Sequence, residues 1–257
     1  MNMQKREKLN QTLRQWPANG LRTAALLRTQ GISSALLHHY VQRKWLEQVE
    51  RGVYRRPGDT PGWQAALHTV QTEEKLPVHV GGLTALELQG YGHYTGERHL
   101  FLYGPSRSRL PAWFGGAAGR ELRFTHTNFL NDAPQESLHS MSIEGVPLTV
   151  STPERSALEM LYHVPGQVGF AEALEVVGGL AVLRVGLMQM LLESCSSVKA
   201  KRLFLYYARE ASHSWYPALD RSRINLGAGK RELVKGGKLD KEFLLTVAVS
   251  PYANCPL

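Results

Sequence analysis

Two absences limit the kind of protein that this sequence can encode. Cysteine occurs only 2 times in 257 residues, and no stretch reaches the roughly 18 apolar residues that a membrane-spanning helix needs. Cys195 and Cys255 lie far apart and match no metal-ligand spacing, so we expect free thiols in a reducing compartment. The first residues are charged and no apolar run follows them, unlike a secretion signal. We therefore expect a cytoplasmic protein.

Catalytic and cofactor-binding motifs are also missing. The run 227–231 lacks the first glycine and the Ser or Thr of a phosphate-binding loop. Asp220, Glu232 and Lys235 lack the Glu-x-Lys spacing of a nuclease site. The 10 histidines include no pair at a metal-binding spacing on one helix, and no serine-nucleophile motif is present. We expect no enzyme activity, no metal and no cofactor.

Acidic residues are scarce at both ends of the chain, whose formal net charge is +8. Residues 1–60 contain 11 Lys+Arg against 4 Asp+Glu, a net +7, whereas residues 61–198 contain 8 against 13, a net −5. Residues 199–257 contain 11 against 5, a net +6. Such basic segments favour a polyanion as partner, because each neutralised phosphate releases counterions. Charge does not identify the polyanion, and a solvated basic face is the alternative.

Apolar spacing predicts three short helices in the N-terminal part. The first is expected over residues 5–16, and the Pro-Ala-Asn-Gly run 17–20 ends it. The second begins near Thr23 and ends at Gly31, where a residue without Cβ can adopt the left-handed conformation. Two short helices joined by a tight glycine turn make a helix-turn-helix.

The third helix has two chemically different faces. It begins at Ser33 or Ser34, whose hydroxyls can accept the free N–H groups of its first turn. One face is expected to pack inward and consists of Leu37, Tyr40, Val41 and the aliphatic stem of Lys44. The opposite face is polar and consists of Ser34, His38, Gln42 and Arg43, with His39 near the boundary.

A β-hairpin is predicted directly after the third helix. Residues 45–49 and 53–56 form its strands, and Gly52 suits the turn between them. A hairpin in this position is the wing of a winged helix-turn-helix. The Pro- and Gly-rich segment 57–62 then predicts a linker. We expect two domains: a winged helix-turn-helix at residues 1–58 and a second domain at residues 62–257.

The exposed side chains of the third helix and the wing suit DNA. Gln42 and Arg43 can read base edges in the major groove. The hydroxyls and N–H groups at the helix start can hold phosphates, and the wing arginines can reach the backbone or the minor groove. The expected DNA contacts are Ser33, Ser34, His38, His39, Gln42, Arg43, Lys44, Arg51, Tyr54, Arg55 and Arg56. A winged helix that binds only proteins is the alternative.

The run 23–56 resembles the N-terminal domain of AbiEi-family antitoxins, above all in its Arg-Gly-Val-Tyr wing at residues 51–54. Later parts of the family resemble residues 81–86, 151–158, 226–231 and 235–240. The resemblance implies a type IV toxin–antitoxin regulator that binds inverted repeats at its own promoter and represses the operon. It also implies that the C-terminal domain counters a nucleotidyltransferase-like toxin, for which a stable complex is not required. Because one winged helix reads one half-site, monomers or weak dimers are expected to pair on the DNA.

The rest of the chain predicts strands first and helices later. Helices are expected over residues 62–74, from Thr152 with Pro153 at its first position, and between 168 and 211. The β-prone runs are 78–80, 100–103, 122–125, 141–143, 146–150 and 243–249. The whole chain is therefore expected to be α+β, with an N-terminal winged helix-turn-helix and a larger mixed α+β domain.

Basic residues interleaved with aromatic ones after residue 198 leave one question open. Such a pattern can bind a nucleic-acid backbone or a single strand. The alternative is a core stripe of Leu203, Phe204 and Tyr207 with solvated lysines. The candidate second basic surface consists of Lys199, Lys201, Arg202, Arg221, Arg223, Lys230 and Arg231. It would suit an effector domain that binds RNA or a nucleotide.

Overall fold

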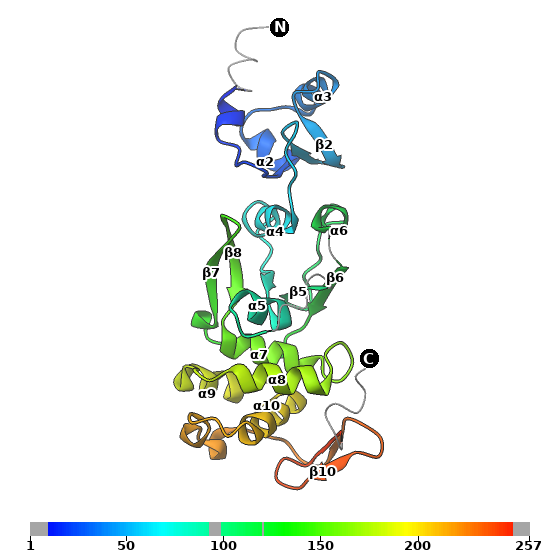
Figure 1. Ribbon diagram of the computed structural model, residues 1–257. Helices are drawn as coiled ribbons and strands as arrows, with labels where there is room; N and C mark the ends of the chain where they lie inside the picture. The colour runs from blue at the N-terminus through cyan, green and yellow to red at the C-terminus, as the bar shows by residue number, and fades with distance from the viewer. Residues whose placement is uncertain (1–9, 93–98, 120, 249–257) are drawn as a thin grey trace. The chain divides into compact units, whose positions relative to one another are not determined.

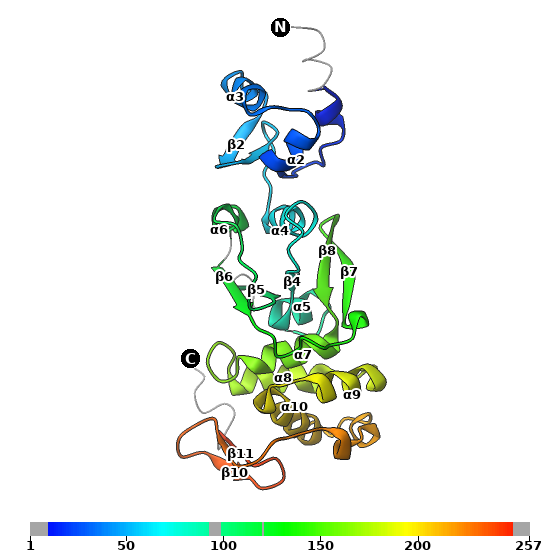
Figure 2. The ribbon, with the colours of Figure 1, turned by 180° about the vertical axis from the view of Figure 1, so that it is seen from behind.

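The computed structural model describes residues 10–92, 99–119 and 121–248 (Figures 1 and 2). These residues form two compact units. The first unit comprises the described residues up to 78 together with 107–122 and 140–148. The second unit comprises the described residues of 79–106, 123–139 and from 149 onward.

The first unit begins with a small N-terminal module, residues 10–56 (Figure 1). Its first described residues, 10–14, are helical, and residues 5–9 of the predicted first helix lie outside the described residues. Two helices and a β-hairpin follow, and the strands pair antiparallel in the order β1-β3-β2. The elements are β1 (Arg22–Thr23), α2 (Ala24–Thr29), α3 (Ser34–Gln42), β2 (Glu47–Glu50) and β3 (Val53–Arg55).

Local chemistry explains where α2 and α3 begin. The Thr23 hydroxyl accepts a hydrogen bond from the Leu26 N–H and caps α2, whereas Ser33, not Ser34, caps α3. Gly31 has a φ of 81°, the left-handed conformation predicted for the turn between the helices. Strand β1 was not predicted, because a strand of 2 residues shows no periodicity and exists only through its pairing with β3.

The predicted inward face of α3 is confirmed with one correction. Leu37 and Tyr40 are buried, and Val41 is half-buried. Lys44 is exposed, because α3 ends at Gln42 and Lys44 has a φ of 58° beyond the helix end. Its aliphatic stem therefore does not belong to the inward face. The buried residues of this core are Trp16, Leu27, Ile32, Leu37, Tyr40, Leu46 and Tyr54.

Helix α4 (Trp63–Thr72) belongs to the same unit as the N-terminal module. Directly after it, the buried carboxylate of Glu73 accepts hydrogen bonds from the Thr23 N–H and from the Arg22 guanidinium, each at 2.8 Å. These bonds connect the start of α2 to the residue that follows α4. The inward face predicted for this helix is confirmed, with Trp63, Ala66, Leu67 and Val70 buried. The unit also contains α6 (Trp113–Ala118).

A five-stranded sheet in the order β6-β5-β4-β8-β7 follows. Its central strand β4 pairs antiparallel with β5 and parallel with β8, where Val80 is opposite Val150. All β-prone runs predicted between residues 78 and 150 are strands. Along the chain, β6, β7 and β8 each begin in one unit and end in the other. The strands are β4 (His79–Val80), β5 (His99–Gly104), β6 (Glu121–His126), β7 (Leu138–Ile143) and β8 (Val146–Ser151).

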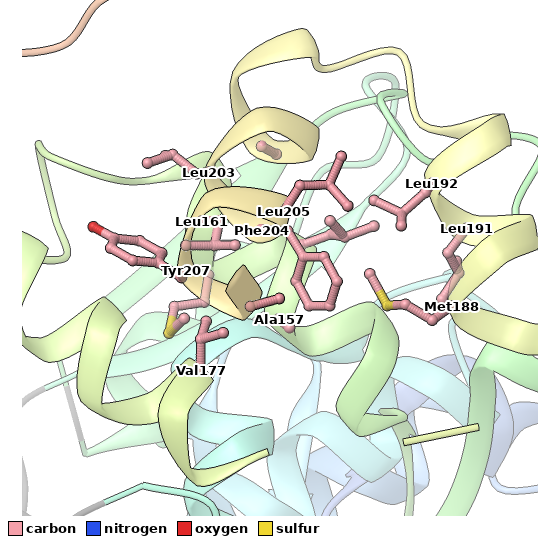
Figure 3. Packing of buried hydrophobic residues seen from close by; sticks show 14 of the residues in the cluster. Ala157, Leu161, Val177, Met188, Leu191, Leu192, Leu203, Phe204, Leu205 and Tyr207 are labelled. Carbon is pink, nitrogen blue, oxygen red and sulfur yellow. The ribbon is translucent and has the colours of Figure 1, made fainter. Parts of the chain in front are cut away.

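Helices follow the strands in the chain, as predicted. Helix α7 begins at Pro153 after its cap Thr152, and it packs against α5 and α10. Figure 3 shows Phe204 of α10 pointing toward Ala157 of α7 and Met188 of α9, and all three side chains are fully buried. The helices are α5 (Gly82–Leu88), α7 (Pro153–Tyr162), α8 (Phe170–Gly179), α9 (Val185–Ser194) and α10 (Val198–Glu210), with a 3-10 turn at Gln135–Ser137.

After α10 the chain forms two 3-10 turns and a small sheet in the order β10-β11-β9 (Figure 2). Strand β11 pairs antiparallel with β10 and parallel with β9. The strand predicted at 243–249 is shorter than expected, and Val249 lies outside the described residues. The elements are the turns Tyr216–Ala218 and Arg221–Arg223, β9 (Arg231–Glu232), β10 (Lys238–Asp240) and β11 (Leu245–Val247).

The architecture is the predicted α+β arrangement, with helices and strands in both units. Within the described ranges, no helix is long and apolar enough to cross a membrane. Cys195 is a buried free thiol, and burial raises its pKa to about 11. Cys255 lies outside the described residues.

Candidate DNA interface

Helix α3 presents an exposed polar face opposite its buried one. The Ser33 hydroxyl accepts from the Leu36 N–H at 3.3 Å, which fixes the start of the helix. Ser33 and Ser34 are both exposed and lie at the positive end of the helix. The buried Leu37 and Tyr40 hold the other side in the core of the N-terminal module. This end of α3 can therefore receive a phosphate.

Two polar side chains occupy the middle of the exposed face. His38 and Gln42 are one helical turn apart and both exposed, and their Nε2 atoms are 2.9 Å apart. Arg43, the residue that caps the end of α3, is exposed, and so is Lys44. The exposed face predicted for the third helix is thus present, with its cations at the C-terminal end of the helix.

Two predicted contacts are less accessible than the rest of this face. Tyr54 is buried in the core of the N-terminal module with 9% exposure, so its ring is not available to DNA. His39 is half-buried, and its ring contacts Trp45 edge-on with centroids 6.0 Å apart. The prediction of a Tyr54 contact was wrong, because its side chain points inward from β3, the central strand of the three-stranded sheet.

The three wing arginines differ in their surroundings. Arg51 stands exposed in the turn beside Gly52, whose φ is 82°. Arg55 donates to Glu47 across the hairpin at 2.8 Å, and Arg56 donates to Asp59 at 3.0 Å. These carboxylates partly neutralise Arg55 and Arg56, whereas within the described residues Arg51 has no ion pair. Arg51 is therefore the wing cation most available to a phosphate.

The structure contradicts the predicted second basic surface at its centre. Lys201 and Arg202 are only 3% and 1% exposed, and burial lowers the pKa of both groups. The Arg202 guanidinium donates to four backbone carbonyl groups in the segment after α10, at 2.8–3.2 Å; they belong to Leu226, Gly227, Gly229 and Leu244. Neither side chain can reach a nucleic acid, and Lys201 is not one of the solvated lysines of the alternative.

The other residues of that cluster are divided between internal pairing and solvent. Lys199 donates from Nζ to the carbonyl oxygens of Tyr162 at 2.6 Å and Val164 at 2.8 Å. Arg221 pairs with Glu242, and Arg223 pairs with Glu193 at 2.9 Å. Lys230 and Arg231 are exposed. The core stripe of Leu203, Phe204 and Tyr207 is confirmed as buried.

A buried polar network in the second unit was not predicted from the sequence. The carboxylate of Glu159 accepts from His79 Nε2 and Arg155 Nε, each at 2.8 Å, from Ser151 Oγ at 2.9 Å and from the Gly82 N–H at 3.1 Å. Burial by itself would raise the pKa of Glu159, but the charge and hydrogen bond of His79, followed by those of Arg155, lower it to about 2.

This network holds the fold together rather than forming a catalytic set. Ser151 and His79 both bind the carboxylate of Glu159, so no histidine activates the serine as a nucleophile. A Cβ on Gly81 would lie 2.2 Å from the Glu159 Oε2, so the network also requires a glycine there. The segments around Gly81 and Ser151 are two of those that carry the family resemblance. Within the described ranges, His, Cys, Asp and Glu side chains form no group that could hold a metal.

The fold and the exposed helix define the class: a two-part α+β protein whose first part is consistent with a winged helix-turn-helix. The chain belongs to the family of AbiEi-antitoxin transcriptional regulators of type IV toxin–antitoxin systems. The model of the AbiEi antitoxin N-terminal domain matches residues 5–96, and the model described as "Transcriptional regulator, AbiEi antitoxin, Type IV TA system" matches residues 97–248.

Comparison with solved structures supports the fold. The crystal structure of the RV2827C protein from Mycobacterium tuberculosis matches with a TM-score of 0.62 and 14% identity, over 92% of this chain and 88% of that chain. At this identity the likeness concerns the fold alone. No curated protein sequence matches the chain.

Proposed function

We propose that the protein is a cytoplasmic autorepressor and antitoxin that binds inverted repeats in its own promoter through α3 and the wing. The observation that carries this proposal is the exposed polar face of α3, with Ser33 and Ser34 at its start, Gln42 near its end and Arg43 as its cap. The opposite face is buried, so the helix has one orientation in which it can meet a ligand. A regulator family supports DNA as that ligand.

Each part of this surface has a separate task in the proposed complex. The start of α3 holds a phosphate through backbone N–H groups and the Ser34 hydroxyl, which fixes the depth of the helix in the major groove. Gln42 and Arg43 meet the base edges. Arg51 on the wing binds the neighbouring backbone. Two copies of the chain then occupy the two halves of an inverted repeat, as monomers or as a weak dimer.

The C-terminal part, in this proposal, counters a nucleotidyltransferase-like toxin without requiring a stable toxin–antitoxin complex and without enzymatic activity of its own. Its support is the family description of the match over residues 97–248, which names an antitoxin of a type IV system. An effector that binds RNA through a basic surface is less well supported, because Lys201 and Arg202 are buried.

The deciding experiment measures binding of the full-length protein to its own upstream region by fluorescence anisotropy. A scrambled duplex of equal length is the comparison, and both are titrated at two salt concentrations. Tight binding to the native duplex that weakens steeply with salt supports the proposal. Arg43→Ala should weaken it, while Lys230→Ala, which removes an exposed cation outside the N-terminal module, should not. Equal weak binding to both duplexes would sink the proposal.

A further inference from the structure

The side chains of His38 and Gln42 are joined through their Nε2 atoms, 2.9 Å apart. Gln42 meets His38 through its amide nitrogen, Nε2, which is always a donor. The Nε2 atom of the His38 ring accepts this bond in the tautomer that carries its proton on Nδ1. Both residues are exposed and lie one turn apart in the middle of the polar face of α3. In that tautomer the ring favours the amide orientation in which the Gln42 nitrogen faces His38.

The remaining hydrogen-bonding groups of Gln42 match a particular base. With one N–H used by His38, the amide keeps one N–H donor and its carbonyl acceptor for a ligand. Adenine offers the complementary pair in the major groove, an N7 acceptor and an N6 donor, whereas guanine offers two acceptors, N7 and O6. A reversed amide, with its oxygen toward His38, would instead present two N–H donors and suit guanine.

We infer that Gln42 reads an adenine in the major groove and that His38 is a positioning residue that selects adenine over guanine by orienting the amide. This inference rests on the proposed function, since it requires α3 to enter the groove. It assigns the base identity at one operator position to a contact between two side chains of the protein. The polar residues on a recognition helix do not by themselves determine which base is read at that position.

The test is selection of duplexes from a randomised library by full-length protein, followed by anisotropy titration of the selected duplex and of its A-to-G variant. The proteins are the wild type, Gln42→Ala, His38→Lys and His38→Glu. Lysine can only donate, so it should turn the oxygen of the Gln42 amide toward residue 38. Glutamate can only accept, so it should keep the amide nitrogen facing residue 38. Gln48→Ala, an exposed glutamine on β2, is the matched control.

We expect the wild type and the Gln48→Ala protein to prefer adenine at one position by about tenfold or more. Gln42→Ala should lose this preference at that position only. His38→Lys should change the preferred base to guanine. His38→Glu should keep adenine but bind all duplexes more weakly, because its charge repels phosphates. A merely structural role of His38 would change affinity without changing the base.

An enriched motif that Gln42→Ala leaves unchanged at every position would overturn the inference and leave the proposed function intact. Retention of adenine by the His38→Lys protein would do the same. Absence of any enriched duplex with the wild type would overturn the proposed function and this inference with it. Because both side chains are exposed, circular dichroism is expected to show unchanged folding of every variant.

Discussion

Two segments of similar basic charge differ in where the fold places some of their cations. Residues 1–60 carry a net +7 and residues 199–257 a net +6. In the first segment Arg43 and Arg51 are exposed, next to the polar face of α3. In the second, Lys201 and Arg202 are buried. A basic segment can therefore offer cations to a polyanion only where the fold leaves them unpaired and exposed.

The reason lies in the chain around each cation. Arg202 is on α10, a helix buried by apolar neighbours, and the segment after α10 offers it four carbonyl oxygens, of which that of Leu244 also accepts from the Arg231 N–H of β9. A buried guanidinium has five N–H donors and is well suited to such a cluster. Arg43 and Arg51 are at a helix end and a hairpin turn, where no comparable set of acceptors surrounds them.

Replacing the buried Arg202 has the largest expected effect. Arg202→Met removes a side-chain donor from four carbonyl groups in a half-buried segment, so we expect a loss of about 3 kcal/mol in the free energy of unfolding. Urea denaturation followed by circular dichroism measures it. Lys230→Met, which replaces an exposed cation of the same cluster, should change stability by less than about 0.5 kcal/mol. Equal effects of the two changes would contradict the interior role.

The buried Glu159 extends the comparison to pH. Its folded pKa of about 2 lies below the ordinary value of 4.5, so its stabilising contribution is complete above about pH 4.5 and is lost as the pH falls toward 2. The difference corresponds to about 3 kcal/mol. Urea denaturation between pH 2 and 7 should show this slope in the wild type and a flatter one in Glu159→Gln. The control Glu232→Gln, at an exposed site, should keep the wild-type slope.

Changes on α3 test the exposed side chains that are proposed to contact bases. Gln42→Ala and Arg43→Ala should each weaken binding to the native upstream duplex by about 1–3 kcal/mol, because each removes a base contact. Binding to a scrambled duplex should change little, and the free energy of unfolding should stay the same. Anisotropy titration of both duplexes measures the difference. Equal loss on both would show that these side chains bind only the backbone.

The smallest expected effects on DNA affinity are those of the wing arginines. Arg51→Ala should reduce affinity for every duplex and lower the slope of log affinity against log salt by about 0.9, the share of one phosphate contact. Arg55→Ala should do less, because Glu47 already holds that guanidinium at 2.8 Å. Titrations at four salt concentrations give both slopes. A larger change from Arg55 than from Arg51 would show that the Glu47 pair opens on DNA.

The N-terminal module was predicted well because its signals are local. The caps Thr23 and Ser33, the turn glycine Gly31 and the two faces of α3 are all set within a few residues. What local signals missed was the two-residue strand β1 and the bond between Glu73 and Thr23, which joins residues far apart in the chain. The domain boundary at residues 58–62 stays a prediction.

For the second unit the sequence indicated the elements but not their polar contacts. Every predicted strand between residues 78 and 150 is present, because alternation and turn residues lie within each run. The network around Glu159 could not be read in this way, since His79, Ser151 and Glu159 come from β4, β8 and α7.

By itself, the sequence determined the order of helices and strands, the absence of a long apolar span and the polar face of α3. These follow from periodicity, capping and side-chain chemistry, which act over one or two turns of chain. Tertiary structure alone decided which cations reach solvent. Arg202 is inside and Arg51 outside because burial and pairing depend on acceptors that arrive from distant segments, and a guanidinium binds whichever acceptors surround it.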